Sequence, residues 1–156
     1  MSDPWKPHVT VAAVIEQGGR FLFVEETTHD GLRLNQPAGH LEPGESLVQA
    51  CVRETLEETA YAFVPTHLLG TYLWRSDNGL TYLRFAFVGT LGSHDAARPL
   101  DTGIVRTLWL NPEELNDLTP MHRSPLVMQC VRDYRAGQRF DLEAVRTHAS
   151  ALSSLL

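Results

Sequence analysis

The sequence predicts an α/β fold, an α/β/α sandwich on a mixed sheet, in a single domain over residues 1–156. Apolar runs of strand length, rich in β-branched and aromatic residues, alternate with two or three segments that have helical apolar spacing. No repeat, linker or biased tract divides the chain. Its 156 residues, 43% of them hydrophobic, are enough to bury one core without disulfides or a structural metal.

The first strands are expected near the N-terminus. Residues His8–Ile15 (HVTVAAVI) and Arg20–Val24 (RFLFV) flank Gly18-Gly19, a pattern typical of a β-hairpin. The polar stretch 27–35 is expected to be a loop. In the segment 36–40 that follows, Gly39 permits a close backbone approach.

A helix is predicted from Ser46 to about Ala60, because this segment has no Gly or Pro and its apolar residues recur with helical spacing. Ser46 is the expected N-cap. The later elements follow from the same rules: strands at 68–74, 81–88 and 104–110, a short helix opened by Asn111-Pro112, and a helix from Ser124 to Ala136 that ends at Gly137.

Charge and composition exclude several classes of protein. The balance of 13 Lys and Arg against 19 Asp and Glu gives a net charge of −6, which argues against a general nucleic-acid binder. A phosphorylated small molecule stays compatible, because bound cations supply positive charge. We expect a cytoplasmic protein that does not bind membranes, since there is neither a signal-peptide core nor a spanning apolar stretch.

The cysteine and histidine patterns suggest neither a disulfide nor a zinc site. Cys51 and Cys130 lie in apolar helical surroundings and are expected to be buried free thiols. No HExxH or HxxxH spacing occurs among the histidines.

The candidate chemistry lies on the predicted helix 46–60. Glu54, Glu57 and Glu58 fall within roughly a 100° arc at the edge of its apolar face. Their carboxylates repel one another, and Arg53 is expected to neutralise only one of them, most naturally Glu57 at i,i+4. A divalent cation would compensate the rest, and oxygen ligands favour Mg²⁺ or Mn²⁺. On the helix alone, a solvated acidic face is the alternative.

The segment 39–61 resembles the Nudix hydrolase signature. In that signature a Gly, five residues, a Glu and seven residues precede Arg-Glu-U-X-Glu-Glu-X-Gly-U, where U is bulky and apolar. The matching residues are Gly39, Glu45, Arg53, Glu54, Glu57 and Glu58. Thr55, Ala60 and Tyr61 depart from the pattern. Because a left-handed conformation is costly for Ala, we expect the helix to run on or end differently at Ala60.

The resemblance implies a Nudix-type fold and a role for each motif residue. Glu54, Arg53 and Glu57 would be catalytic, with Glu54 a metal ligand or the general base that activates water. Metal ligands would be the Gly39 carbonyl, Glu54, Glu57 and Glu58, and the ion Mg²⁺, with Mn²⁺ possible. The reaction would be hydrolysis of a phosphoanhydride bond in a small phosphorylated substrate.

Further blocks over about nine tenths of the chain look like the NudJ-type phosphatase subfamily. They include KPHVTVA (6–12), NQPAGHLE (35–42), LRF (83–85) and RSPLV (123–127). This likeness implies release of phosphate from nucleoside di- and triphosphates, or from thiamine-related pyrophosphates, to give monophosphates.

Candidate substrate-binding residues are Glu25, Arg84 and Arg123. Glu25 or its neighbour Glu26 ends a strand and would hydrogen-bond an amino group of the substrate. Arg84 alternates with apolar residues and would meet a phosphate, and Arg123 would clamp an anion at a helix start. Surface charge is the alternative for each. Nearby aromatics such as Trp74 and Tyr82 would stack on a heterocycle, or belong to the core.

Two rival functions stay open. One is another Nudix pyrophosphatase, acting on nucleotide sugars, ADP-ribose, dinucleoside polyphosphates or nucleoside triphosphates. The other is a Nudix-fold ligand-binding domain without catalysis, which the retained Glu residues argue against. The general base and the choice between monomer and homodimer also stay open.

Overall fold

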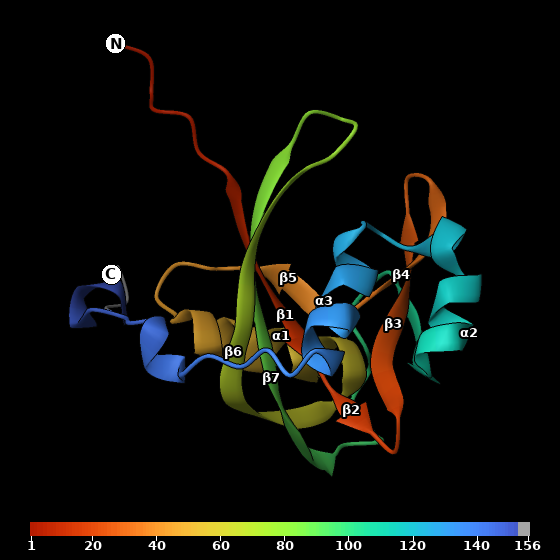
Figure 1. Cartoon of the computed structure of the whole chain (residues 1–156). Helices are drawn as coiled ribbons and strands as arrows, with labels where there is room; N and C mark the ends of the chain where they lie inside the picture. Colours follow the sequence, from red (N-terminus) through yellow and green to blue (C-terminus); the bar gives the residue numbers. More distant parts are fainter. Residues whose placement is uncertain (153–156) are drawn as a thin grey trace.

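The computed structural model of the protein describes residues 1–152, and its strands form two sheets (Figure 1). The first sheet, in the order β5-β1-β7-β6, contains β1 (His8–Val14), β5 (Ala38–His40), β6 (Tyr61–Arg75) and β7 (Thr81–His94). In it β1 runs parallel to β7, while the other neighbours are antiparallel. The second sheet contains β2 (Glu16–Gln17), β3 (Arg20–Thr28), β4 (Gly31–Asn35) and β8 (Ile104–Leu110), each of the others pairing with β3.

Three α-helices accompany the sheets: α1 (Leu47–Thr59), α2 (Pro112–Asp117) and α3 (Leu126–Arg135). Three short 3₁₀ helices follow or intervene: η1 (Thr119–Met121), η2 (Leu142–Ala144) and η3 (Ala149–Leu152). None of the helices in the described part of the chain is long and apolar enough to cross a membrane.

The first sheet is covered on both faces (Figure 1). On one face Val11, Ala13 and Phe87 pack with Ala50 and Cys51 of α1. The other face contributes to a core shared with α3 and the second sheet, which includes Ala12, Val14, Phe21, Phe23, Leu34, Val127 and Cys130. Successive residues of β1 therefore point into different cores, which explains why this strand is apolar on both sides. The predicted α/β fold on a mixed sheet is confirmed.

The helix α1 begins as predicted. The Ser46 hydroxyl accepts from the Gln49 N–H, and the Gln49 side chain accepts from the Ser46 N–H, which makes a complete capping box. Its end differs from the expectation. Ala60 adopts the left-handed conformation, with φ 62°, and donates its N–H to the Leu56 carbonyl. Ala60 therefore adopts the left-handed conformation that is typical of Gly, the residue that the signature has at this position.

The predicted hairpin between 8–15 and 20–24 is wrong in its pairing. The turn at Gly18-Gly19 exists, but it joins β3 only to the two-residue strand β2. β1 pairs with β5 and β7 in the other sheet instead. The reason is burial: both runs have apolar residues on both faces, so each needs two covered sides, which a two-stranded hairpin does not supply.

The predicted loop at 27–35 is also wrong, because β3 continues to Thr28 and β4 returns along it from Gly31. The Thr28 hydroxyl donates to the Gly31 carbonyl and accepts from the Asp30 N–H, which closes the turn. The polar residues Arg33 and Asn35 of β4 are half-buried and alternate with the buried Leu34. The strand at 104–110 has the predicted bounds. The strand at 68–74 is the second half of the longer β6, and the strand at 81–88 is the first part of the longer β7.

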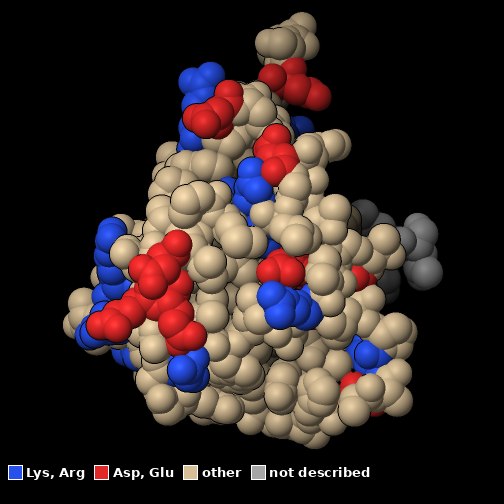
Figure 2. All heavy atoms as spheres, turned by 90° about the vertical axis from the view of Figure 1, so that its right-hand side faces the viewer, with Lys and Arg blue, Asp and Glu red and all other residues tan. Residues whose placement is uncertain are grey.

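Charged side chains are mixed on the surface. Figure 2 shows Lys and Arg in small groups beside Asp and Glu on the face it presents. This distribution agrees with the formal net charge of −6 and its modest excess of acids.

Candidate active site

Arg53 connects the acidic residues of the motif. Its Nε and Nη2 donate to the two oxygens of Glu45 at 2.9 and 2.8 Å, and Nη2 also reaches the His40 carbonyl at 3.0 Å. Its Nη1 donates to Glu54 at 2.9 Å and to Glu57 at 3.1 Å. Arg53 thus hydrogen-bonds three carboxylates, Glu57 among them as expected, while its single positive charge balances only one of the three.

Three carboxylates converge beside this arginine. Oxygens of Glu54, Glu57 and Asp101 lie within 4.8 Å of one another. Asp101 comes from the segment between β7 and β8, which is held against α1 by a 3.0 Å hydrogen bond from the Asp101 N–H to the Glu57 carbonyl. Three like charges this close repel strongly unless a cation or protons compensate them.

Glu58 stands apart from this group. It is buried, and one carboxylate oxygen accepts a 2.9 Å hydrogen bond from the Ala38 N–H of β5. Burial raises the pKa of Glu58 to about 9, and the nearby charges of Glu26 and Glu54 add to this effect. Burial also raises the pKa of Glu54, although Arg53 opposes the change.

Gly39 lets α1 approach β5. A Cβ at this position would lie 2.1 Å from the Glu54 carboxyl carbon, so any side chain there would displace the Glu54 carboxylate. The Gly39 backbone lies beside the carboxylate group as a result. Several carboxylate oxygens against an open peptide backbone form an all-oxygen donor set, which fits a hard divalent cation such as Mg²⁺ or Mn²⁺.

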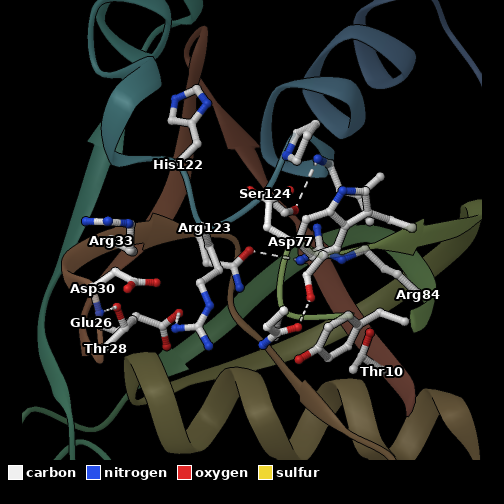
Figure 3. Close-up of a pocket in the computed structure, with 18 of the residues that line it drawn as sticks. Thr10, Glu26, Thr28, Asp30, Arg33, Asp77, Arg84, His122, Arg123 and Ser124 are labelled. Atoms are coloured by element: carbon white, nitrogen blue, oxygen red, sulfur yellow. Dashed lines mark hydrogen bonds and ion pairs between the residues drawn. The ribbon is translucent and has the colours of Figure 1, made fainter. Parts of the chain in front are cut away.

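A cavity of about 760 Å³ opens next to β5, with Ala38, Gly39 and His40 in its wall. Its volume suits a small organic ligand. Figure 3 shows side chains from both sheets and from the start of α3 pointing into it. The remaining lining includes Thr10, Glu26, Arg33, Asn35, Trp74, Asp77, Tyr82, Arg84, His122, Arg123 and Ser124.

Arg84 lies in the wall of this cavity and is 6% exposed. Its Nη2 donates to the Asn35 side-chain oxygen at 2.9 Å, and its Nη1 donates to Gln36 at 3.0 Å. Trp74 and Tyr82 lie in the same wall with their rings stacked, 5.8 Å apart at 23°. These residues are on one face of the first sheet, because Arg84 and Tyr82 are two residues apart on β7.

Arg123 also lines the cavity, and its backbone N–H donates to the Leu34 carbonyl at 2.8 Å. Its guanidinium lies 3.4 Å from Glu26. Burial raises the pKa of Glu26, and Arg123 and Arg84 partly offset this. Glu25, chosen from the sequence, is not in the cavity wall. It points to the other face of β3 and lies 3.4 Å from Arg106 of β8.

The sequence gives weak or no signal for three residues of this site. Asp101 is a single acid in a loop, which is weak evidence for a role, and no spacing relates it to α1. Glu25 and Glu26 are adjacent in one strand, so their side chains point to opposite faces, and the sequence does not say which face borders the cavity. Gln36 read only as the residue before Pro37, yet it is 1% exposed and bonded to Arg84.

Comparison with known proteins gives consistent matches. The sequence model described as NUDIX domain matches residues 6–129. The chain is 41% identical over 141 residues to Phosphatase NudJ of Escherichia coli K12, covering 90% of this chain and 92% of that one. It is also similar to the structure of a NUDIX hydrolase from Nitrosomonas europaea, with a TM-score of 0.90 and 54% identity over 92% of this chain and 98% of that one.

A more distant structure shares the fold alone. The NUDIX domain of Shewanella oneidensis NrtR, solved with ADP ribose, has a TM-score of 0.68 at 21% identity, over 87% of this chain and 93% of that one.

Proposed function

Because the chain belongs to the Nudix hydrolase family, we propose that it removes the terminal phosphate from a small nucleoside di- or triphosphate, or from a thiamine-related pyrophosphate, leaving a monophosphate in the diphosphate case. Nudix hydrolases cleave phosphoanhydride bonds with a divalent metal. The observation that carries the proposal is the convergence of Glu54, Glu57 and Asp101 at the edge of a ligand-sized cavity.

The metal would be held by Glu54, Glu57 and Asp101, with the Gly39 carbonyl beside them and Glu58 as a neighbouring acid. We propose Mg²⁺, with Mn²⁺ as the alternative, since all these donors are oxygens. When bound, such an ion neutralises charge on the phosphate oxygens and favours attack by water on phosphorus.

The residues of the chain have separate tasks in this proposal. Arg53 fixes the orientation of the Glu54 and Glu57 carboxylates through Nη1, while Glu45 holds the guanidinium from its other edge. Glu54 is then the acid best placed to accept a proton from water, because it lies against Gly39 at the cavity wall. Arg84 and Arg123 contact the substrate inside the cavity.

One assay tests this reaction. The protein is incubated with Mg²⁺ or Mn²⁺ and with nucleoside di- and triphosphates, thiamine diphosphate and ADP-ribose, and phosphate and pyrophosphate are measured separately. We expect phosphate and the nucleoside or thiamine monophosphate from the diphosphates. Pyrophosphate release, or cleavage of ADP-ribose alone, would favour another Nudix pyrophosphatase. Binding without turnover of any compound would indicate a ligand-binding domain.

A further inference from the structure

The charge of Arg84 is not neutralised by any ion pair in the described part of the chain. Its partners are the amide oxygens of Asn35 and Gln36 and, at 3.8 Å, the Cys130 sulfur. No carboxylate lies within 4.0 Å of its nitrogens in residues 1–152. A buried guanidinium held only by neutral groups is costly to desolvate, so a structural role alone accounts poorly for it.

Gln36 fixes the direction of this guanidinium. Its Nε2 donates to the Val127 carbonyl in α3 at 2.7 Å, so its amide oxygen must face Arg84. Gln36 is itself 1% exposed. The buried Gln36 amide therefore fixes the position of the Arg84 guanidinium without neutralising its positive charge.

Arg84 keeps hydrogen-bond donors for a ligand. Of its five N–H groups, those of Nη1 face Gln36 and Cys130, and one on Nη2 serves Asn35. The N–H on Nε and the second one on Nη2 have no partner within the described chain. Since no buried side-chain nitrogen there lacks a partner, Nε must be reachable by solvent, and the solvent beside it is the cavity. Nε and Nη2 lie on the same edge of the planar guanidinium, the edge that donates to paired acceptors.

Arg84 lies at a distance from the place where the phosphoanhydride bond of the substrate would be cleaved. In the first sheet Arg84 of β7 pairs with Thr10 of β1, and Thr10 pairs with His40 of β5. Two strand spacings put its backbone about 10 Å from β5, where Glu54 lies against Gly39. The next row on the same face is Trp74 and Tyr82. A substrate whose phosphates reach Glu54 would thus bring its heterocycle, and not its reacting phosphate, to Arg84.

We propose that Arg84 determines base selectivity, by donating its free N–H pair to two neighbouring acceptors on the edge of a nucleobase stacked against Trp74 and Tyr82. This rests on the proposed function. Cytosine (O2 and N3) and guanine (O6 and N7) offer such a pair. Adenine and uracil alternate donors and acceptors along each edge, so they offer only one good partner.

The test compares kcat/KM for CDP, GDP, ADP and UDP with Mg²⁺ in the wild type, Arg84→Gln and Arg75→Gln. Arg75 is an exposed arginine of the same hairpin outside the cavity wall, which makes it the matched control. We expect a preference of about 10-fold or more for CDP and GDP, the scale of a bidentate arginine contact. Arg84→Gln should remove the preference by lowering kcat/KM for CDP and GDP more than for ADP and UDP, and Arg75→Gln should keep it.

Two results would overturn the proposal. The first is a wild type that treats the four diphosphates alike. The second is an Arg84→Gln enzyme in which all four fall by the same factor, which would make Arg84 a phosphate site. If circular dichroism shows that Arg84→Gln does not fold, Arg84→Lys is assayed in its place. Lysine keeps the positive charge but lacks the paired N–H donors. An Arg84→Lys enzyme that still prefers CDP and GDP would contradict the proposal.

A binding measurement separates this inference from the proposed reaction. Isothermal titration with CMP, GMP, AMP and UMP reports base recognition without turnover. Tighter binding of CMP and GMP that disappears in Arg84→Gln supports the inference even if no diphosphate is hydrolysed. Equal binding of the four monophosphates contradicts it even if hydrolysis proceeds as proposed.

Discussion

Arg53 and Arg84 are the two arginines at the centre of the site, and their surroundings are opposite in charge. Arg53 lies among carboxylates and donates to Glu45, Glu54 and Glu57. Arg84 is more deeply buried and donates to the neutral amides of Asn35 and Gln36. The donors of Arg53 are used within the protein, so its task is to position acids. The donors of Arg84 are partly free, which is the basis of its proposed role in binding a ligand.

The two regions also carry opposite unpaired charge. Around Arg53 the carboxylates outnumber the cation, and Asp101 adds to the excess. At the wall of the cavity a cation has no acidic partner within ion-pair distance in the described residues. In the proposed function a metal–phosphate group would compensate the first region, and an acceptor-rich heterocycle would bind at the second. A nucleotide would then lie with its two ends in these two regions.

The largest effect is expected from removing one charge of the acidic region. Glu57→Gln should lower kcat by roughly 100-fold or more, the scale of a lost catalytic charge, with little change in the affinity for a nucleoside monophosphate. Steady-state kinetics in Mg²⁺ and isothermal titration measure the two quantities. Glu113→Gln, at an exposed acid in the first turn of α2, is the control and should keep the wild-type rate. A wild-type rate in Glu57→Gln would remove this residue from the chemistry.

A steric change at the boundary between the regions should be nearly as strong. Gly39→Ala places a methyl group 2.1 Å from the Glu54 carboxyl carbon, so the carboxylate must move. Displacements of about 1 Å cost up to about 100-fold in rate, and we expect a loss of this order in kcat. Gly92→Ala is the control, because its Cβ would meet its nearest neighbour at 3.4 Å. Unchanged kcat in Gly39→Ala would show that Glu54 need not occupy this position.

A smaller effect concerns stability and pH. The hydrogen bond from Arg53 holds the pKa of Glu45 below its ordinary value. A depressed folded pKa stabilises the protein above the unfolded pKa of about 4.3, and this contribution is lost as the pH falls through the folded value. The wild type should therefore exceed Glu45→Gln in free energy of unfolding at pH 7, with the difference shrinking below about pH 4.5. Urea titrations at pH 7, 5 and 4 measure it. A difference that grows in acid would contradict the role given to Arg53.

The smallest effect is expected from a substitution at the end of α1. Ala60→Gly relieves the left-handed strain at the end of α1 but removes a buried methyl group. We expect a net gain of about 0.5 to 1 kcal/mol in the free energy of unfolding, with kcat within about twofold of the wild type. Thermal denaturation and steady-state kinetics check the two parts. A loss of stability would mean that the methyl contacts outweigh the strain.

The predictions from sequence succeeded where the information is local. The helix α1, its Ser46 cap and the placing of its acids follow from spacings of three and four residues. They failed where pairing is long-range. β1 was assigned to a hairpin because it precedes a Gly-Gly turn, although its partners are β5 and β7. An apolar run does not by itself specify which distant strand it will pair with.

By itself the sequence determined the acidic arc of α1, a glycine at position 39 that permits close backbone approach, and an arginine among apolar residues at position 84. Only the tertiary structure decided that Asp101 joins the acids, that Glu26 rather than Glu25 faces the cavity, and that Gln36 holds Arg84 without neutralising it. The physical reason is distance along the chain. Helical spacing fixes neighbours a few residues apart, whereas contacts such as that between Gln36 and Arg84 exist only once two sheets and α3 have packed together.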